Sequence, residues 1–105
     1  MLLSMDGFTV IAEPTRRAIL DRLQVSECDV GSLVQELGIS QPLVSKHLRV
    51  LREAGVVDVE VVGKRRVYRL SDEPLPDVLD WVKPFIRRWT ESFDTLAEAL
   101  DEDSQ

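Results

Sequence analysis

The chain has 105 residues, 44% hydrophobic and 30% charged, a balance typical of one globular domain and not of a disordered chain. No apolar run is long enough to span a membrane, and the first six residues lack the pattern of a signal peptide. The single cysteine, Cys28, excludes a disulfide within the chain, so we expect a cytoplasmic protein. The net charge is −6.

The first elements predicted are a short apolar segment over residues 8–12 and a helix over residues 14–25. Pro14 suits the first position of a helix, where no backbone N–H is needed. Ile19, Leu20 and Leu23 are expected to face the core, and the three arginines of this helix, Arg16, Arg17 and Arg22, are expected to lie elsewhere on it.

Two short helices follow, over about residues 30–37 and 41–54. Asp29 is a plausible N-cap for the first helix, and Gly38 is the expected stop. Ser40 or Gln41 caps the second helix, and Pro42 is tolerated in its first turn. The apolar side chains of the second helix recur at helical spacing and predict its buried stripe: Val44, Leu48 and Leu51. Together the two helices predict a helix-turn-helix at about residues 30–54.

A β-hairpin is predicted over residues 56–71. Val57, Val59 and Val61 alternate with acidic residues, which is the pattern of a half-buried strand. Gly63 and Lys64 form a turn signal, and a second strand runs from Arg66 to Leu70. The basic residues Lys64, Arg65 and Arg66 therefore lie at or near the tip of the hairpin.

The last predicted element is a helix over about residues 75–101. Its apolar residues recur with the alternating spacing of four and three that is typical of a coiled-coil seam. The seam consists of Leu75, Leu79, Val82, Ile86, Trp89, Phe93, Leu96 and Leu100. Pro84 is expected to bend or restart the helix, and residues 101–105 are expected to be a frayed acidic tail.

The distribution of charge allows two interpretations of the helix-turn-helix and hairpin: a solvated basic surface, or a face that binds DNA. Residues 43–69 carry seven basic and three acidic side chains, whereas residues 70–105 carry three basic and ten acidic ones. An α-helix fits the major groove of B-DNA, and a basic hairpin beside it can contact the backbone. The DNA-binding residues predicted on this basis are Ser40, Gln41, Ser45, Lys46, Arg49, Lys64, Arg65 and Arg66. We expect Ser40, Gln41 and Ser45 to read bases, and Arg49 and the hairpin to hold phosphates.

Four segments in this order resemble the arsenical-resistance-regulator (ArsR/SmtB) family of winged helix-turn-helix proteins. They are EPTRRAIL at residues 13–20, QPLVSKHLRVL at 41–51, AGVV at 54–57 and GKRRVYRL at 63–70. The resemblance spans about residues 8–71. It implies a dimeric transcriptional repressor with its first and last helices at the interface, an inverted-repeat operator, and release of the DNA by a signal that the sequence does not identify.

Metal-sensing members of that family often carry two cysteines at the start of the first motif helix. The matching positions here are Asp29 and Gly31, and residues 75–105 contain no histidine. Because tight binding of Zn²⁺ needs a cluster of thiolates or imidazoles, we expect no metal site and no cofactor within one chain. A metal-responsive repressor with ligands assembled across a dimer stays open as an alternative.

Several residues have a structural and a functional interpretation. His47 packs against the first helix, contacts DNA or senses pH, with packing favoured. Cys28 is either a bystander or a redox switch. The aromatic residues of the last helix either form an effector pocket or belong to the core or dimer interface: Trp81, Phe85, Trp89 and Phe93.

The sequence thus predicts a mainly α-helical winged helix-turn-helix with a small β-hairpin, in a single domain over residues 1–105. We predict a sequence-specific DNA-binding repressor that works as a homodimer, and neither an enzyme nor a membrane protein. The predicted dimer interface consists of Leu79, Val82, Ile86, Trp89, Phe93 and Leu96, with residues 8–12 beside them. The alternative from another class is a winged helix that binds proteins and no longer binds DNA.

Overall fold

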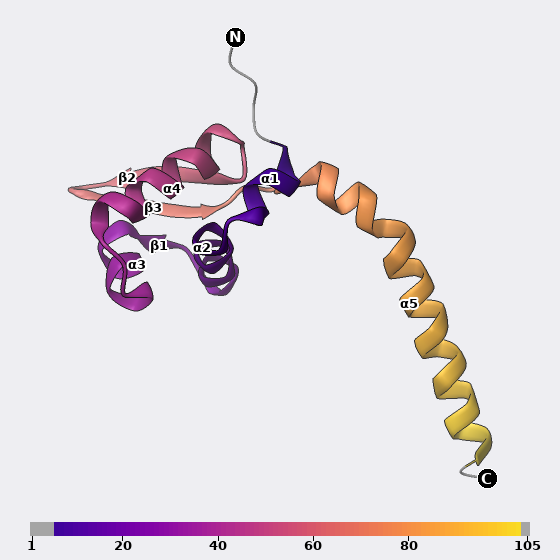
Figure 1. The fold of residues 1–105 in the computed structure, drawn as a ribbon. Coiled ribbons are helices and arrows are strands. Elements are labelled where there is room, and N and C mark those ends of the chain that lie inside the picture. Colours follow the sequence, from indigo (N-terminus) through magenta and orange to yellow (C-terminus); the bar gives the residue numbers. More distant parts are fainter. Residues whose placement is uncertain (1–5, 104–105) are drawn as a thin grey trace.

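The computed structural model describes residues 6–103 as five helices and a small antiparallel sheet (Figure 1). The elements are α1 (Gly7–Ala12), α2 (Pro14–Val25), β1 (Cys28–Asp29), α3 (Val30–Leu37), α4 (Gln41–Glu53), β2 (Val57–Val62), β3 (Arg65–Leu70) and α5 (Pro76–Asp103). This order confirms the mainly helical winged helix-turn-helix, with α3 and α4 as its two helices and β2 and β3 as the hairpin.

Short polar side chains set the starts of α3 and α4, as predicted. The Ser32 amide donates to Asp29 Oδ1 at 2.7 Å, and the Leu43 amide donates to Ser40 Oγ at 3.4 Å. Gly38 ends α3 with a φ of 67°, a left-handed conformation that costs glycine little. The turn between the helices is therefore fixed by residues that satisfy the helix ends.

The sheet has one strand that the sequence did not predict. Its order is β1-β3-β2, and β1 places Cys28 opposite Tyr68 and Asp29 opposite Val67. A strand of two residues is too short to show an alternating pattern. The burial pattern expected for the valines of β2 is confirmed only in part, because Val57 is buried whereas Val61 is 67% exposed. Val61 lies near the tip of the hairpin, away from the helices.

The core lies between the helices and the inner face of the sheet. Its fully buried side chains come from α1, α2, α3, α4 and β2: Val10, Ile19, Leu33, Val44, Leu48, Leu51 and Val57. The predicted stripes of α2 and α4 are thus confirmed as core. One expectation was wrong, because Arg16 is not on an outer face of α2 but is 8% exposed. Its guanidinium donates to the Val10 and Thr9 carbonyls of α1.

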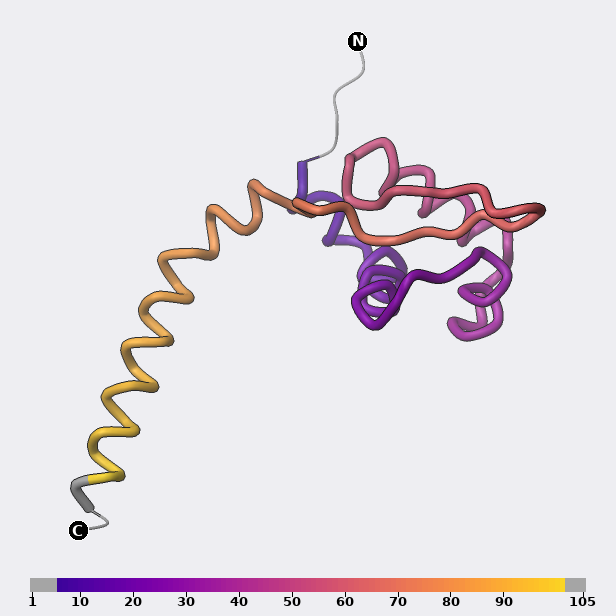
Figure 2. Tube along the Cα trace, turned by 180° about the vertical axis from the view of Figure 1, so that it is seen from behind, coloured from indigo at the N-terminus to yellow at the C-terminus, as the bar shows by residue number. Residues whose placement is uncertain are grey.

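The helix α5 leaves the body beside α1 and projects away from it (Figures 1 and 2). The radius of gyration is consequently 18.4 Å, against about 13 Å for a compact domain of this length. Of the bend or restart expected at Pro84, the restart does not occur, because α5 is continuous through this residue. The proline frees one carbonyl of the preceding turn, and on this exposed helix water can bind that carbonyl.

The expected fraying of the C-terminal tail was also wrong for its first part, since α5 continues to Asp103. Residues 104 and 105 lie outside the described part of the chain. Within residues 6–103, no helix has both the length and the apolar character needed to cross a bilayer.

Candidate nucleic-acid interface

The outward face of α4 is polar because its apolar side chains recur every three to four residues and are buried. Val44, Leu48 and Leu51 pack into the core. Gln41, Ser45 and Arg49, which are four residues apart, are exposed on one stripe of the helix. The sequence thus presents three hydrogen-bonding side chains along one line, starting at the helix N-terminus.

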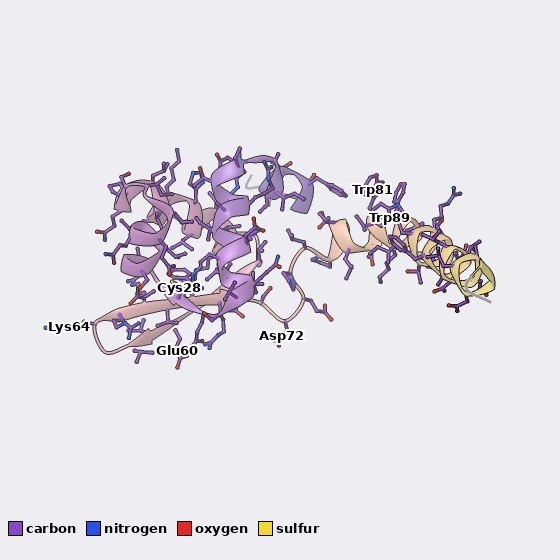
Figure 3. The ribbon with its side chains drawn as sticks, turned by 90° about the horizontal axis from the view of Figure 1, so that it is seen from below. Cys28, Glu60, Lys64, Asp72, Trp81 and Trp89 are labelled. Carbon is purple, nitrogen blue, oxygen red and sulfur yellow. The ribbon has the colours of Figure 1, made fainter. Side chains whose placement is uncertain are left out.

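The hairpin of β2 and β3, which forms the wing of the fold, carries the second set of polar residues. Gly63 makes its turn with a φ of 63°, and Val62 pairs with Arg65 at the last step of the ladder. Lys64 therefore lies at the tip of the wing, at the opposite end of the molecule from Trp89 of α5 (Figure 3). Lys64, Arg65 and Arg66 are all exposed.

The α4 stripe and the wing line a common open groove of about 930 Å³. The start of α3 also contributes to the lining. The lining residues are Asp29, Val30, Gly31, Gln41, Ser45, Arg49, Arg52, Glu53, Lys64, Arg65, Arg66 and Tyr68. The structure therefore brings together six of the eight predicted contact residues, from elements that are separated in the sequence. Whether these residues touch DNA stays a prediction.

Two predicted residues do not line this groove, and six residues outside the predicted set do, one of them the cationic Arg52. Ser40 caps α4, and Lys46 is exposed outside the lining. Arg52 lines the groove one turn beyond Arg49. Its position on the polar face of α4 was visible in the sequence, because it lies seven residues after Ser45. The contribution of the α3 start had no such signal, since only the tertiary structure places it there.

Five of the groove's lining residues are cationic and two are acidic, and each acid pairs with an arginine. Arg49 Nε lies 3.1 Å from Glu53 Oε1, and Arg65 Nε lies 2.8 Å from Asp29 Oδ2. Hydrogen bonds from Ser32, and then from Arg65, lower the pKa of Asp29 to about 2. The other three cations of the groove, Arg52, Lys64 and Arg66, have no ion-pair partner among residues 6–103.

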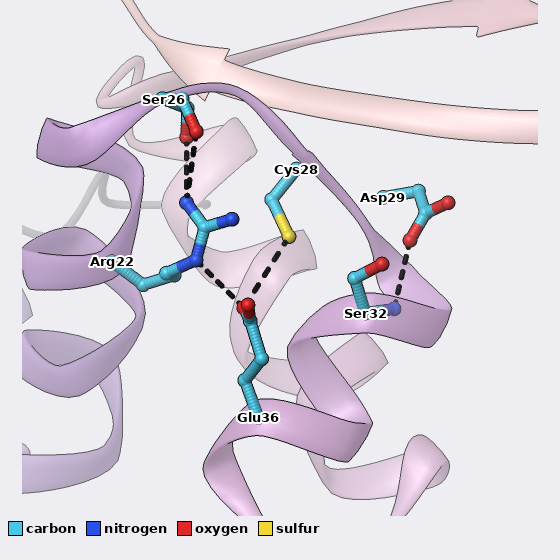
Figure 4. Close-up of polar contacts among 6 residues, drawn as sticks. All are labelled: Arg22, Ser26, Cys28, Asp29, Ser32 and Glu36. Atoms are coloured by element: carbon cyan, nitrogen blue, oxygen red, sulfur yellow. Dashed lines mark hydrogen bonds and ion pairs between the residues drawn. The ribbon is translucent and has the colours of Figure 1, made fainter.

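Cys28 lies beside a polar contact between α2 and α3 (Figure 4). Arg22 Nε donates to Glu36 Oε2 at 2.6 Å, and the Cys28 sulfur lies 3.9 Å from the same oxygen. Burial raises the pKa of the Cys28 thiol, and only 5% of the residue is exposed. A thiol with these properties reacts slowly with oxidants, which favours the bystander interpretation over a redox switch.

His47 is buried on the inner side of α4, as the packing interpretation expected, with 7% of the residue exposed. Its Nε2 lies 3.7 Å from Glu13 Oε2, at the start of α2. Its Nδ1 has no hydrogen-bond partner within the described residues. This side chain faces the α2 helix and not the groove.

In the described part of the chain, no three side chains of His, Cys, Asp or Glu lie close enough together to hold a metal ion. At the start of α3, Asp29 uses both carboxylate oxygens in contacts within the protein. Gly31 has no side chain to contribute.

A second surface is apolar and lies on α5 and α1. Phe8 packs edge-on against Trp81 at a ring separation of 5.7 Å, and Trp81 lies 4.9 Å from Phe85. Farther along α5, more than half of each large side chain of the seam is exposed: Trp89, Phe93, Leu96 and Leu100. Of the α5 seam, only Leu75, just before the helix, packs against the core.

Comparison with protein families gives one match that covers the helix-turn-helix. The model of the bacterial regulatory protein, arsR family, matches residues 13–59. The chain is 35% identical over 81 residues to the transcriptional repressor SdpR of Bacillus subtilis, a match that covers 77% of this chain and 90% of SdpR. It is 37% identical to the HTH-type transcriptional regulator Rv2034 of Mycobacterium tuberculosis, across 90% of this chain and 86% of Rv2034.

Solved structures of similar fold have corresponding names. A possible transcriptional regulator for arsenical resistance superposes with a TM-score of 0.70 and 37% identity, across 77% of this chain and 84% of that one. The transcriptional repressor BigR from Xylella fastidiosa superposes with a TM-score of 0.62 and 30% identity, across 75% and 81%.

Proposed function

Because the chain belongs to the ArsR family of bacterial regulatory proteins, we propose that the groove between α4 and the wing binds the operator of a gene that the protein represses. The chain is a DNA-binding transcriptional regulator of that family.

One observation carries the proposal: the chain is acidic overall, yet its groove is basic. The net charge is −6, but five cations and two acids line the groove. Phosphates attract basic side chains locally, while the acidic remainder of the chain repels DNA from other orientations. The charge distribution therefore favours contact through this one face.

The two sides of the groove suit different parts of DNA. The helix α4 has the dimensions of the major groove, and the uncharged side chains of Gln41 and Ser45 can hydrogen-bond to base edges there. Lys64 and Arg66 extend from the exposed end of the wing and carry charge suited to phosphates. We assign base reading to the start of α4 and backbone contact to the wing.

A second copy of the chain is the proposed partner of α5 and α1. Apolar side chains at coiled-coil spacing are exposed along α5, and a single chain covers few of them. A two-fold dimer through this surface would present two α4 helices to DNA, which requires an operator of two inverted half-sites. An effector that releases the DNA is part of the proposal, with its chemistry unassigned.

A regulator of this kind acts on chromosomal DNA, so we place the protein in the cytoplasm. Binding DNA requires no catalysis, so we propose no enzymatic activity.

A protein-interaction module without DNA binding would share the fold. The basic groove favours the DNA-binding function over that alternative, because contact with a protein does not require three unpaired cations beside a helix of major-groove size.

The test is selection of DNA fragments by the purified protein from a random pool, followed by mobility shift at low and high salt. We expect one enriched inverted repeat, bound more weakly as salt rises. Replacing Lys64 and Arg66 together with Gln should weaken binding strongly. Replacing Arg87 and Arg88 of α5 with Gln is the matched control with the same change of charge, and it should not. Failure to enrich any sequence, with no binding at low salt, would favour the protein-interaction module.

A further inference from the structure

The ion pair between Asp29 and Arg65 joins the wing to the start of α3 at the point where the sheet ends. On β1, Asp29 is the last residue, and its partner on β3 is Val67. Beyond Val67 toward the tip, β3 pairs with β2 alone. Arg65 is the next residue on the same face of β3, because side chains alternate along a strand. Its Nε donates to Asp29 Oδ2 at 2.8 Å, which carries the connection one step past the end of the ladder.

The carboxylate that receives this bond is itself fixed. Asp29 Oδ1 accepts the Ser32 amide at 2.7 Å as the N-cap of α3 (Figure 4). The Asp29 side chain is 18% exposed, whereas that of Arg65 is 65% exposed. The long, mobile partner is therefore held by a short, capped one, and the wing is tied to the helix-turn-helix.

The neighbouring cations of the wing differ from Arg65. Lys64 and Arg66 have no ion-pair partner in the described part of the chain. A guanidinium that already faces a carboxylate attracts a phosphate less, since the acid cancels part of its charge and repels the phosphate. Lys64 and Arg66 are therefore better suited to bind phosphates than Arg65, whose charge is partly cancelled by Asp29.

We propose that Asp29 is a positioning residue that anchors the wing through Arg65, which leaves phosphate contact to Lys64 and Arg66. The anchoring stands on the geometry of the free protein, and the part on phosphates rests on the proposed function. It differs from the sequence-based prediction, in which all three wing cations hold phosphates.

Three substitutions that change charge and little else separate the anchoring of the wing from contact with phosphates. Asp29→Asn keeps an oxygen for the Ser32 amide, because Asn is as good an N-cap as Asp, and it removes only the charge that faces Arg65. Arg65→Gln removes the other partner at an exposed position. Lys64→Gln, one residue away and with the same change of charge, is the control for an ordinary phosphate contact.

The first measurement needs no DNA. The Arg65 Nε–H of the free full-length protein is followed by nitrogen-15 NMR for its exchange with water. We expect slower exchange in the wild type than for the Nε–H groups of Arg52 and Arg66, and loss of this protection in Asp29→Asn. Exchange of Arg65 as fast as that of Arg52 in the wild type would overturn the anchor, whatever the protein does with DNA.

The second measurement is the slope of log affinity against log salt on random-sequence DNA. Lys64→Gln should flatten it by about 1 for each phosphate that the lysine neutralises, whereas Arg65→Gln should leave it close to wild type. Asp29→Asn should steepen the slope, and adding Arg65→Gln should restore it. Equal flattening by Lys64→Gln and Arg65→Gln, or no steepening in Asp29→Asn, would overturn the proposal. If the wild type showed no salt-dependent binding, the proposed function would be contradicted. The exchange measurement would still test whether Asp29 anchors the wing through Arg65.

Discussion

The buried Nε of Arg16 donates to the Val10 carbonyl oxygen at 2.7 Å and so joins α2 to α1. In a continuous helix that carbonyl would accept the amide of the residue four positions on, which here is Pro14 and has no N–H. Arg16 therefore supplies the donor that the proline lacks. The same guanidinium reaches the Thr9 carbonyl at 3.0 Å through Nη2.

Replacing Arg16 with Ala should lower the free energy of unfolding by about 1.5–3 kcal/mol, because it removes a charged donor and leaves a buried carbonyl without a partner. Urea unfolding followed by circular dichroism measures this. Arg17→Ala is the matched control: Arg17 also donates to an α1 carbonyl, that of Ile11, but it is exposed. Its loss should cost less than about 0.5 kcal/mol. Equal losses in the two variants would contradict the role of burial.

Discrimination between DNA sequences should depend on the start of α4. Gln41→Ala or Ser45→Ala should cost about 1–3 kcal/mol on the selected operator and little on random DNA, since neither side chain carries charge. Fluorescence anisotropy on both DNAs at one salt concentration measures the ratio. A loss of the same size on random DNA would remove these two residues from base reading.

General attraction to DNA should depend on the tip of the wing. Lys64→Gln should weaken the operator and random DNA alike, because a phosphate contact carries no sequence information. Anisotropy titrations at several salt concentrations give both affinities. Lys83→Gln on α5 is the control, and it should leave them unchanged. Full affinity in Lys64→Gln would mean that the wing is a solvated surface.

The proposed dimer should depend on the exposed seam of α5. Changing Trp89 and Phe93 together to Ser should give folded monomers, because the fully buried core contains no residue of α5. Sedimentation velocity measures the state of association, and circular dichroism reports the fold. Glu91→Ser with Thr95→Ser alters the opposite face of the helix and should leave the dimer intact. A dimer that persists without Trp89 and Phe93 would place the interface elsewhere.

Stability in acid should depend on Asp29. The pKa of this carboxyl is about 2 in the folded protein, below its ordinary value of 3.8. The stabilisation is therefore complete above about pH 4 and is lost as the pH falls toward 2. Unfolding free energies measured across that interval should fall less steeply in Asp29→Asn than in the wild type. Parallel curves would show that the carboxylate makes no such contribution.

The bounds of α2, α3 and α4 could be predicted because each depends on local chemistry that the sequence displays. Asp29 and Gly38 act at the ends of α3 through hydrogen bonds to residues close in sequence, and Pro14 occupies the first turn of α2, where no backbone N–H is needed. Burial of Arg16 was missed because residues 8–12 were predicted as an apolar segment and not as a helix, so the Val10 carbonyl that Pro14 leaves without a donor could not be recognised. At Pro84 the sequence left a bend or a restart open, and α5 continues through it because proline is less disruptive where water replaces the missing bond.

In the candidate site, too, features set by local sequence could be predicted, whereas a contact between distant residues could not. The α4 stripe could be read from its spacing, and the order of helix-turn-helix and hairpin predicted that the wing would lie beside it. The ion pair of Asp29 and Arg65 could not be read, since 36 positions separate the two residues and only the β1–β3 pairing brings them together. Sequence alone therefore assigned all three wing cations one role.

Site-directed photo-cross-linking to the selected operator tests the groove most directly. The variants Ser45→Cys and Lys64→Cys, each labelled with a short photoreactive group at the new thiol, should cross-link to the DNA. The variant Thr95→Cys on α5 should not, and neither should the wild type, whose Cys28 is buried with a raised pKa. Cross-links from both groove positions alone are the predicted result. Cross-links from Thr95, with none from Ser45 or Lys64, would contradict the claim that the groove between α4 and the wing binds DNA.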